Sequence, residues 1–137
     1  MKLKKVLALL FCLLFIASLG LTSVSASSIT PRWTNTFEVT MSHDNVDGYA
    51  CCYVYIKAYE GTDKIDNVNI KLYRSVGSVL IIEESWENLS VAGDEFEFYD
   101  EVADVPTGYA YRLQVTADVH RYGVVESLDL YHDVYYD

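Results

Sequence analysis

Hydrophobic and polar residues alternate along much of the chain after residue 32. An alternation of period two is typical of half-buried β-strands, whereas an amphipathic helix repeats its apolar residues every three to four positions. The pattern is clearest over residues 49–59. Since successive side chains of a strand point to opposite faces, we expect its even positions to face a core and its tyrosine-rich odd positions to form a half-exposed face. The even set is Ala50, Cys52, Val54, Ile56 and Ala58, and the odd set is Tyr49, Cys51, Tyr53, Tyr55, Lys57 and Tyr59.

Further strands follow from the same reading. A second inward stripe comprises Tyr109, Tyr111, Leu113, Val115, Ala117 and Val119, and shorter alternations cover residues 37–41, 68–73 and 96–99. The uninterrupted apolar run 79–82 predicts a strand that is covered on both faces. The last strand begins near Val124 with less regular alternation, which indicates a bulge, and residues 132–137 extend it or fray. We place turns at residues 43–48, 60–63, 76–78, 90–94, 106–108 and 122–123.

These elements predict an all-β fold, namely a single immunoglobulin-like antiparallel β-sandwich of about seven strands that spans residues 27–137. Two long central strands with short connections favour a sandwich over a barrel. A chain of this length accommodates one domain with one core between two layers.

Residues 1–26 have the three parts of a secretory signal peptide. Lys2, Lys4 and Lys5 form a positive start, residues 6–17 are an unbroken apolar run, and Ala26 closes a short segment with small residues where signal peptidase cuts. A membrane span requires roughly 20 apolar residues, more than this run provides. We therefore expect cleavage after Ala26, secretion, and no membrane attachment of the mature chain.

Charge narrows the range of partners. Three of the ten Lys and Arg leave with the signal and none of the 20 Asp and Glu do, so the net charge falls from −10 to −13 on cleavage. Binding to nucleic acid or to an anionic membrane surface requires a basic patch. The composition therefore argues against both and favours a neutral or cationic partner.

The segment Gly108-Tyr109-Ala110-Tyr111-Arg112-Leu113-Gln114-Val115 resembles the start of strand F in immunoglobulin-like domains. The resemblance implies that Tyr111 anchors the corner before this strand. It also implies that Cys52 takes the inward position that carries the first disulfide cysteine in antibody domains. Its partner's position corresponds to Leu113, so that disulfide cannot form, and no tryptophan marks strand C. These departures indicate the wider immunoglobulin-like architecture and not an antibody-type domain.

A broader resemblance covers most of the chain. The segments that carry it are the Lys-rich start, Thr30-Pro31-Arg32-Trp33, Gly48-Tyr49-Ala50-Cys51, Asn69-Ile70-Lys71-Leu72-Tyr73, Glu84-Ser85-Trp86 and Gly123-Val124-Val125-Glu126-Ser127. In these segments the chain is similar to small secreted β-sandwich proteins of unknown function from Gram-positive bacteria. The resemblance implies a fold and a location and carries no activity.

The mature chain keeps two adjacent cysteines, Cys51 and Cys52. Neighbouring side chains of a strand point to opposite faces, so a disulfide between them would force the backbone out of strand geometry. Three interpretations remain open. Cys52 is a core residue with Cys51 on the outer face, the two form a strained disulfide, or Cys51 links two chains in a disulfide-linked dimer, because an oxidising compartment favours pairing of a leftover thiol.

Outward-facing tyrosines are the best candidates for a binding surface. They are Tyr49, Tyr53, Tyr55 and Tyr59 of one strand, with Tyr73 and Tyr99 on the outward side of others. Tyrosine offers a flat apolar ring with a polar hydroxyl, which suits packing against a protein or stacking on a sugar. The alternative is that the rings pair across strands and only cover the sheet.

A calcium site is the one metal site that the sequence suggests, and we expect no other cofactor. Asp94, Asp100 and Asp104 lie in a dense acidic stretch near predicted strand ends, and carboxylates are the ligands that calcium prefers. The alternative is that this stretch is the solvent face of a strand. Residues 43–48 echo a calcium-binding loop, but His43 and Val54 stand where acidic ligands are needed.

We expect no enzymatic activity, because no motif presents a nucleophile with a base, and the three histidines read as surface residues. The favoured function is a secreted binding or interaction module that meets a protein or glycan partner outside the cell through its Tyr-rich face. One alternative is a carbohydrate-binding module. The other is a small inhibitor or toxin-like protein that acts through an exposed loop, at residues 60–66 or 90–94.

Overall fold

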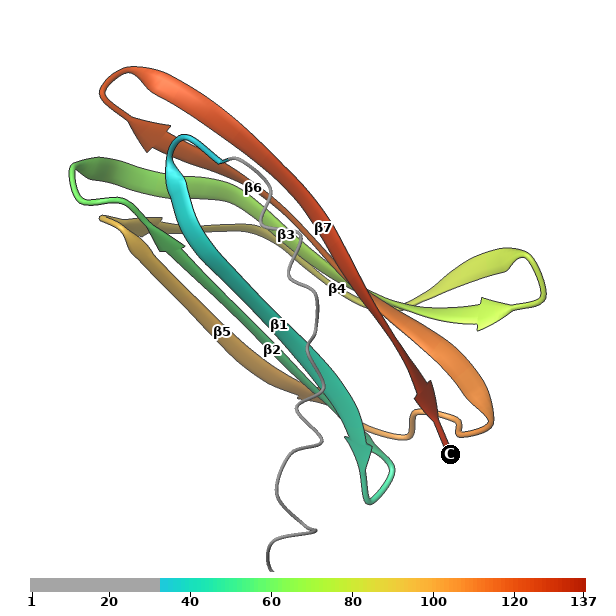
Figure 1. Ribbon diagram of the computed structural model, residues 1–137. Helices are drawn as coiled ribbons and strands as arrows, with labels where there is room; N and C mark the ends of the chain where they lie inside the picture. Colours follow the sequence, from blue (N-terminus) through green and yellow to red (C-terminus); the bar gives the residue numbers. More distant parts are fainter. Residues whose placement is uncertain (1–32) are drawn as a thin grey trace, which may run out of the picture. The chain divides into compact units, whose positions relative to one another are not determined.

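The computed structural model describes residues 33–137 (Figure 1). The expected signal peptide lies outside these residues. Seven strands make up most of the described chain, in agreement with the predicted all-β class. They are β1 (Thr36–Val46), β2 (Tyr49–Ala58), β3 (Thr62–Val76), β4 (Val79–Ala92), β5 (Glu95–Val102), β6 (Tyr109–Arg121) and β7 (Val124–Tyr136).

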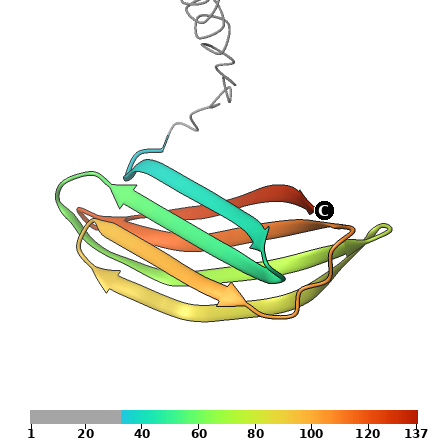
Figure 2. The ribbon, with the colours of Figure 1, turned by 90° about the horizontal axis from the view of Figure 1, so that it is seen from below.

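The strands form two antiparallel sheets, one of three strands in the order β1-β2-β5 and one of four in the order β4-β3-β6-β7. Figure 2 shows the two layers. The hairpins β1–β2, β3–β4 and β6–β7 each stay within a sheet, while the chain crosses between sheets after β2, β4 and β5. Residues far apart in sequence therefore meet, since β2 pairs with β5 and β3 with β6.

The core lies between the sheets and follows the predicted alternation on the two long central strands. On β2 every even residue is buried, and on β6 the inward stripe is buried from Tyr111 to Val119. Tyr109, predicted to continue that stripe, is 36% exposed at the start of β6. Burial of each large apolar side chain contributes about 1.5–3 kcal/mol, so these two strands provide much of the stabilisation of the sandwich.

The first strand is longer than predicted, and this corrects the reading of His43. β1 runs to Val46, and the turn is limited to Asp47 and Gly48, both with positive φ. Asn/Asp-Gly pairs suit such two-residue turns because both central residues need positive φ. His43 is consequently a strand residue, and it is 4% exposed instead of lying on the surface. Phe37 is 59% exposed because the register of β1 shifts near its start.

The apolar run 79–82 is a strand, as predicted, but the expectation that it is covered on both faces is wrong. β4 is an edge strand, and all four of these residues are exposed. A continuous apolar run indicates a strand without showing what covers it.

Two segments expected to be loops are mostly strand. Residues 62–66 begin β3 and residues 90–92 end β4, which leaves only short turns. These turns are tied down by backbone hydrogen bonds from Gly93 to Asp63 (2.9 Å) and from Ala58 to Asp94 (2.7 Å). An extended exposed loop is therefore not present at either place.

The last strand is more regular than predicted. β7 pairs with β6 from Val124 to Tyr136 without a register shift, so the expected bulge is not found and residues 132–136 extend the strand. Within residues 33–137, no helix is long and apolar enough to cross a membrane.

Candidate functional site

Four of the six predicted tyrosines gather on the outer face of the β1-β2-β5 sheet. Tyr49, Tyr53 and Tyr55 alternate along β2, and Tyr99 of β5 lies directly opposite Tyr53. Tyr49 is 47% and Tyr99 59% exposed, while Tyr53 and Tyr55 are half-buried. We call these four residues the Tyr face. Tyr49 and Tyr99 offer the most exposed ring surface of the Tyr face to a partner.

The other two predicted tyrosines lie elsewhere. Tyr59 follows the end of β2 and contacts Phe37 edge-on, with ring centroids 5.6 Å apart, and the Arg121 guanidinium lies 5.4 Å from its ring. Tyr73 belongs to β3, on the solvent side of the four-stranded sheet opposite Arg112. The alternation placed Tyr73 outward, but only the sheet topology shows that it shares no surface with the Tyr face.

Carboxylates surround the Tyr face. The hydroxyl of Tyr53 donates to Glu97 (3.2 Å), and that of Tyr99 donates to Glu101 (2.5 Å). Desolvation, followed by the Glu97 bond, raises the pKa of Tyr53, and the Glu101 bond raises that of Tyr99. Both hydroxyls are thus neutral donors over a wide pH range. Among the outward side chains of β2, Lys57 is the only cation. The electrostatic potential over the Tyr face is therefore negative.

The strained disulfide between the two neighbouring cysteines is not present. Among the described residues Cys51 and Cys52 are both free, with Cys51 half-buried on the outer face and Cys52 buried in the core. Burial raises the pKa of Cys52 to about 12, so this thiol is unreactive at neutral pH. Leu113 of β6 is buried in the same core. The resemblance to strand F implies this inward position.

Tyr111 connects the β5–β6 crossover to the core. Its ring is buried and stacks on Tyr136 with centroids 4.1 Å apart. Its hydroxyl donates to the carbonyl of Pro106, 2.5 Å away and five residues earlier in the chain. This bond holds the corner before β6 in the manner that the resemblance to strand F implied.

The three aspartates of the suggested calcium site are not brought together. Asp94 precedes β5 and pairs with Lys57 (3.0 Å), while Asp100 lies six residues further on and accepts from the Trp86 indole (2.8 Å). Six residues of strand span about 20 Å. Asp104 lies in the crossover after β5. Within the described part of the chain, no three His, Cys, Asp or Glu side chains converge as metal ligands would.

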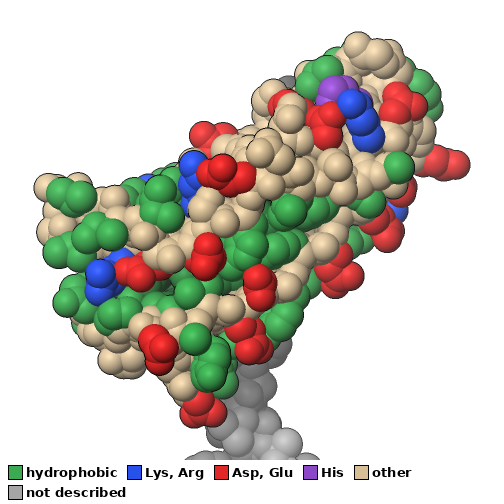
Figure 3. All heavy atoms as spheres, turned by 180° about the vertical axis from the view of Figure 1, so that it is seen from behind, with side chains coloured by type: hydrophobic (Ala, Val, Ile, Leu, Met, Phe, Trp, Pro, Cys, Tyr) green, Lys and Arg blue, Asp and Glu red, His purple; other side chains and the backbone are tan. Residues whose placement is uncertain are grey.

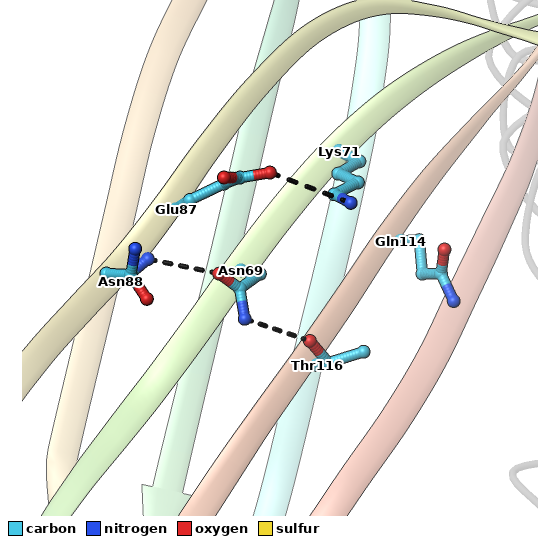
Figure 4. A pocket seen from close by; sticks show the side chains of 6 residues that line it. All are labelled: Asn69, Lys71, Glu87, Asn88, Gln114 and Thr116. Carbon is cyan, nitrogen blue, oxygen red and sulfur yellow. Dashed lines mark hydrogen bonds and ion pairs between the residues drawn. The ribbon is translucent and has the colours of Figure 1, made fainter.

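A polar hollow on the opposite sheet was not recognised from the sequence. It encloses about 380 Å³ on the solvent side of β4, β3 and β6 (Figure 4). Its walls carry amide, hydroxyl and charged groups from Asn69, Lys71, Glu87, Asn88, Gln114 and Thr116.

The hollow coincides with irregular pairing between β3 and β4. The register shifts on both sides of Val68, and Asn67 and Asn88 have positive φ (48° and 58°). The Asn88 N–H donates to Oδ1 of Asn69 (3.0 Å), which fixes that amide. Asparagine tolerates the left-handed conformation better than most residues. Asn67, Asn69 and Asn88 are therefore the feature of the sequence that could have indicated the irregular pairing. Alternation alone predicts only that they are outward-facing strand residues.

A buried histidine joins the two sheets along the β1–β7 side. His43 Nε2 donates to the backbone carbonyl of His132 (2.9 Å), and this leaves Nδ1 to accept from the Tyr136 hydroxyl (2.7 Å). Desolvation lowers the pKa of His43, against the opposing effect of the His132 carbonyl. His43 is thus a neutral structural residue at neutral pH.

Comparison with known proteins adds no assignment: no protein-family model, no curated protein and no solved structure matches the chain.

Proposed function

We propose that the protein is a secreted, non-enzymatic module that binds a protein partner outside the cell through the Tyr face. The observation that carries this proposal is the cluster of Tyr49, Tyr53, Tyr55 and Tyr99 on one sheet face, where the hydroxyls of Tyr53 and Tyr99 donate to Glu97 and Glu101. Tyrosine is enriched at protein interfaces because it gives a large contact area at low entropic cost. The negative frame favours a cationic or neutral partner.

We also propose that the sandwich is of the immunoglobulin-like type. The inner strand β2 and its neighbour β5 in one sheet, and the inner strands β3 and β6 in the other, correspond to strands B and E and strands C and F of that architecture. The fourth strand then pairs with the third, in the place that strand C′ takes in variable domains. The hydrogen bond from Tyr111 to Pro106 supports the same assignment.

The experiment compares retention of extracellular proteins from the native culture on three immobilised forms of the chain. These are the wild type, a variant with Tyr53→Ser and Tyr99→Ser, and a control with Tyr122→Ser and Tyr135→Ser, which are exposed tyrosines outside the Tyr face. We expect a partner that is retained by the wild type and the control and lost from the first variant. Equal retention by all three forms contradicts the proposal.

A second candidate function is carbohydrate binding, and the polar hollow favours it. Sugar hydroxyls pair with groups that both donate and accept, and the hollow presents the amides of Asn88 and Gln114 beside the hydroxyl of Thr116. A glycan array probed with the wild type and with Asn88→Ala tests this function. The expected result is a set of neutral glycans whose signal the variant loses. Silence of the array, or binding that the variant keeps, removes the candidate.

The inhibitor class needs an extended exposed loop at residues 60–66 or 90–94. Both segments are mostly strand with short turns held by backbone hydrogen bonds, so the structure offers no support for this class.

A further inference from the structure

The turn end of the β3–β4 hairpin, residues 76–82, is an exposed apolar segment that we call the hairpin tip. It projects beyond the neighbouring strands (Figure 1), and hydrophobic side chains gather at that end of the molecule in Figure 3. Val79, Leu80, Ile81 and Ile82 are 59%, 43%, 41% and 54% exposed, and no residue of the tip is charged. Contiguous exposed apolar surface of this kind marks an interaction site.

The backbone of the tip narrows the choice of partner. β4 is the edge of its sheet, and alternate residues of an antiparallel strand direct their N–H and C=O groups to its two sides. About half of these groups at residues 79–82 therefore face away from β3, where no strand pairs with them. Proteins normally protect such an edge with charges, proline or a bulge. Residues 76–82 contain no charge and no proline, and the register of β4 shifts only after Ile82, at Glu83. A lipid surface cannot satisfy backbone hydrogen bonds, whereas another strand can.

We propose that the hairpin tip pairs antiparallel with the tip of a second copy of this chain. A twofold axis between the two strands keeps each face of the sheet continuous, so residues of the same face must lie opposite each other. Leu80 and Ile82 lie on the solvent face, opposite Ser75 and Tyr73, and Val79 and Ile81 lie on the other face. The tip is therefore complementary to itself in a register centred on Leu80 or on Ile81, and charge distinguishes the two.

In the register centred on Leu80, this residue lies opposite Leu80 of the second copy, and Val79 lies opposite Ile81. Glu83 lies opposite Gly77 of the second copy. No carboxylate therefore lies opposite another carboxylate or opposite one of the apolar residues 79–82. The register centred on Ile81 places Glu83 opposite Val79, which opposes a charge to an apolar side chain. Pairing centred on Leu80 joins the two four-stranded sheets into one continuous sheet. Because four apolar side chains per copy make a small interface, the association is weak and reversible.

Sedimentation equilibrium of the purified chain tests the proposal. The measurement is made in reductant, and intact mass is used to check the amino terminus. The wild type is expected to shift from monomer toward dimer with rising concentration. Leu80→Lys and Leu80→Glu each place like charges directly opposite one another. Each should weaken the association by about tenfold or more. An equimolar mixture of the two variants should associate again as a heterodimer, since opposite charges then face each other.

The matched controls are Val125→Lys and Val125→Glu. Val125 is 52% exposed and is the second strand residue after the β6–β7 turn, as Leu80 is after the β3–β4 turn. They change the net charge equally and should leave the association intact. The proposal is overturned by a wild type that stays monomeric, by controls that act like the Leu80 variants, or by a mixture that stays monomeric. A monomer that floats with phosphatidylcholine vesicles assigns the tip to a membrane and also overturns it.

Discussion

Removal of one hydroxyl at the corner before β6 tests how the crossover is held. In Tyr111→Phe the ring remains and still stacks on Tyr136, but the hydrogen bond to Pro106 is lost. The carbonyl of Pro106 then loses its partner in a partly buried position. A hydrogen bond of this kind contributes about 0.5–1.5 kcal/mol, and its loss costs about 1–3 kcal/mol where the remaining group stays buried without a partner. For a domain of this size, a loss of 1 kcal/mol lowers Tm by about 4–8 °C.

The assay is urea denaturation followed by far-ultraviolet circular dichroism, with Tyr135→Phe as the matched control. Tyr135 is 59% exposed, and its substitution should change the free energy of unfolding by less than about 0.5 kcal/mol. Tyr111→Ala removes the buried ring as well and should cost about 3–5 kcal/mol. If Tyr111→Phe is as stable as the control, the hydroxyl does not hold the corner and the reasoning is refuted.

Three further predictions concern the pH dependence of stability, the accessibility of the two thiols, and the hydrogen bonds that hold the segment entering β1. The pKa of His43 is lower in the folded state, so the folded protein binds fewer protons than the unfolded chain. The contribution of His43 to stability is fully present above the unfolded pKa of about 6.5 and is lost as the pH falls from there through the lowered pKa of the folded state. Urea midpoints between pH 5 and 8 should show this slope, and His43→Gln should flatten it. A thiol reagent should modify Cys51 in the native protein and Cys52 only after unfolding, which mass spectrometry reports; equal native labelling contradicts the burial of Cys52. Glu126 accepts hydrogen bonds from the backbone N–H groups of Thr34 and Thr36. The substitution Glu126→Gln should therefore lower the free energy of unfolding by about 1–2 kcal/mol, as measured by denaturation. An unchanged free energy of unfolding would show that these contacts are not stabilising.

Local alternation predicts strands and their faces well where both sides of the strand have paired neighbours. β2 and β6 are central strands, each with one face on the core, so period-two burial follows directly from their sequences. β4 shows the limit of the method. Residues 79–82 have the composition of a buried strand, and only the position of β4 at the sheet edge leaves them exposed.

The candidate sites depend on long-range pairing, which no local pattern reports. The Tyr face arises because β2 and β5, far apart in the chain, bring Tyr53 and Tyr99 together. Tyr73 lies in the other sheet because β3 pairs with β4 and β6. The sequence places His43 in a turn because polar residues follow it, although Asp47 and Gly48 alone suffice for the two-residue turn. The partner that buries it, Tyr136, lies ninety-three residues later.

The strand order also determines when the chain can fold. β2 needs β5 and β3 needs β6 before either sheet has its inner strands paired on both sides. During synthesis the first four strands therefore emerge as two hairpins with their apolar faces uncovered, and the closure of long loops makes such topologies slow to fold. The exposed run at residues 79–82 emerges within this period. Conditions that slow synthesis or delay completion of β6 should thus increase aggregation more than changes in the final stability would suggest.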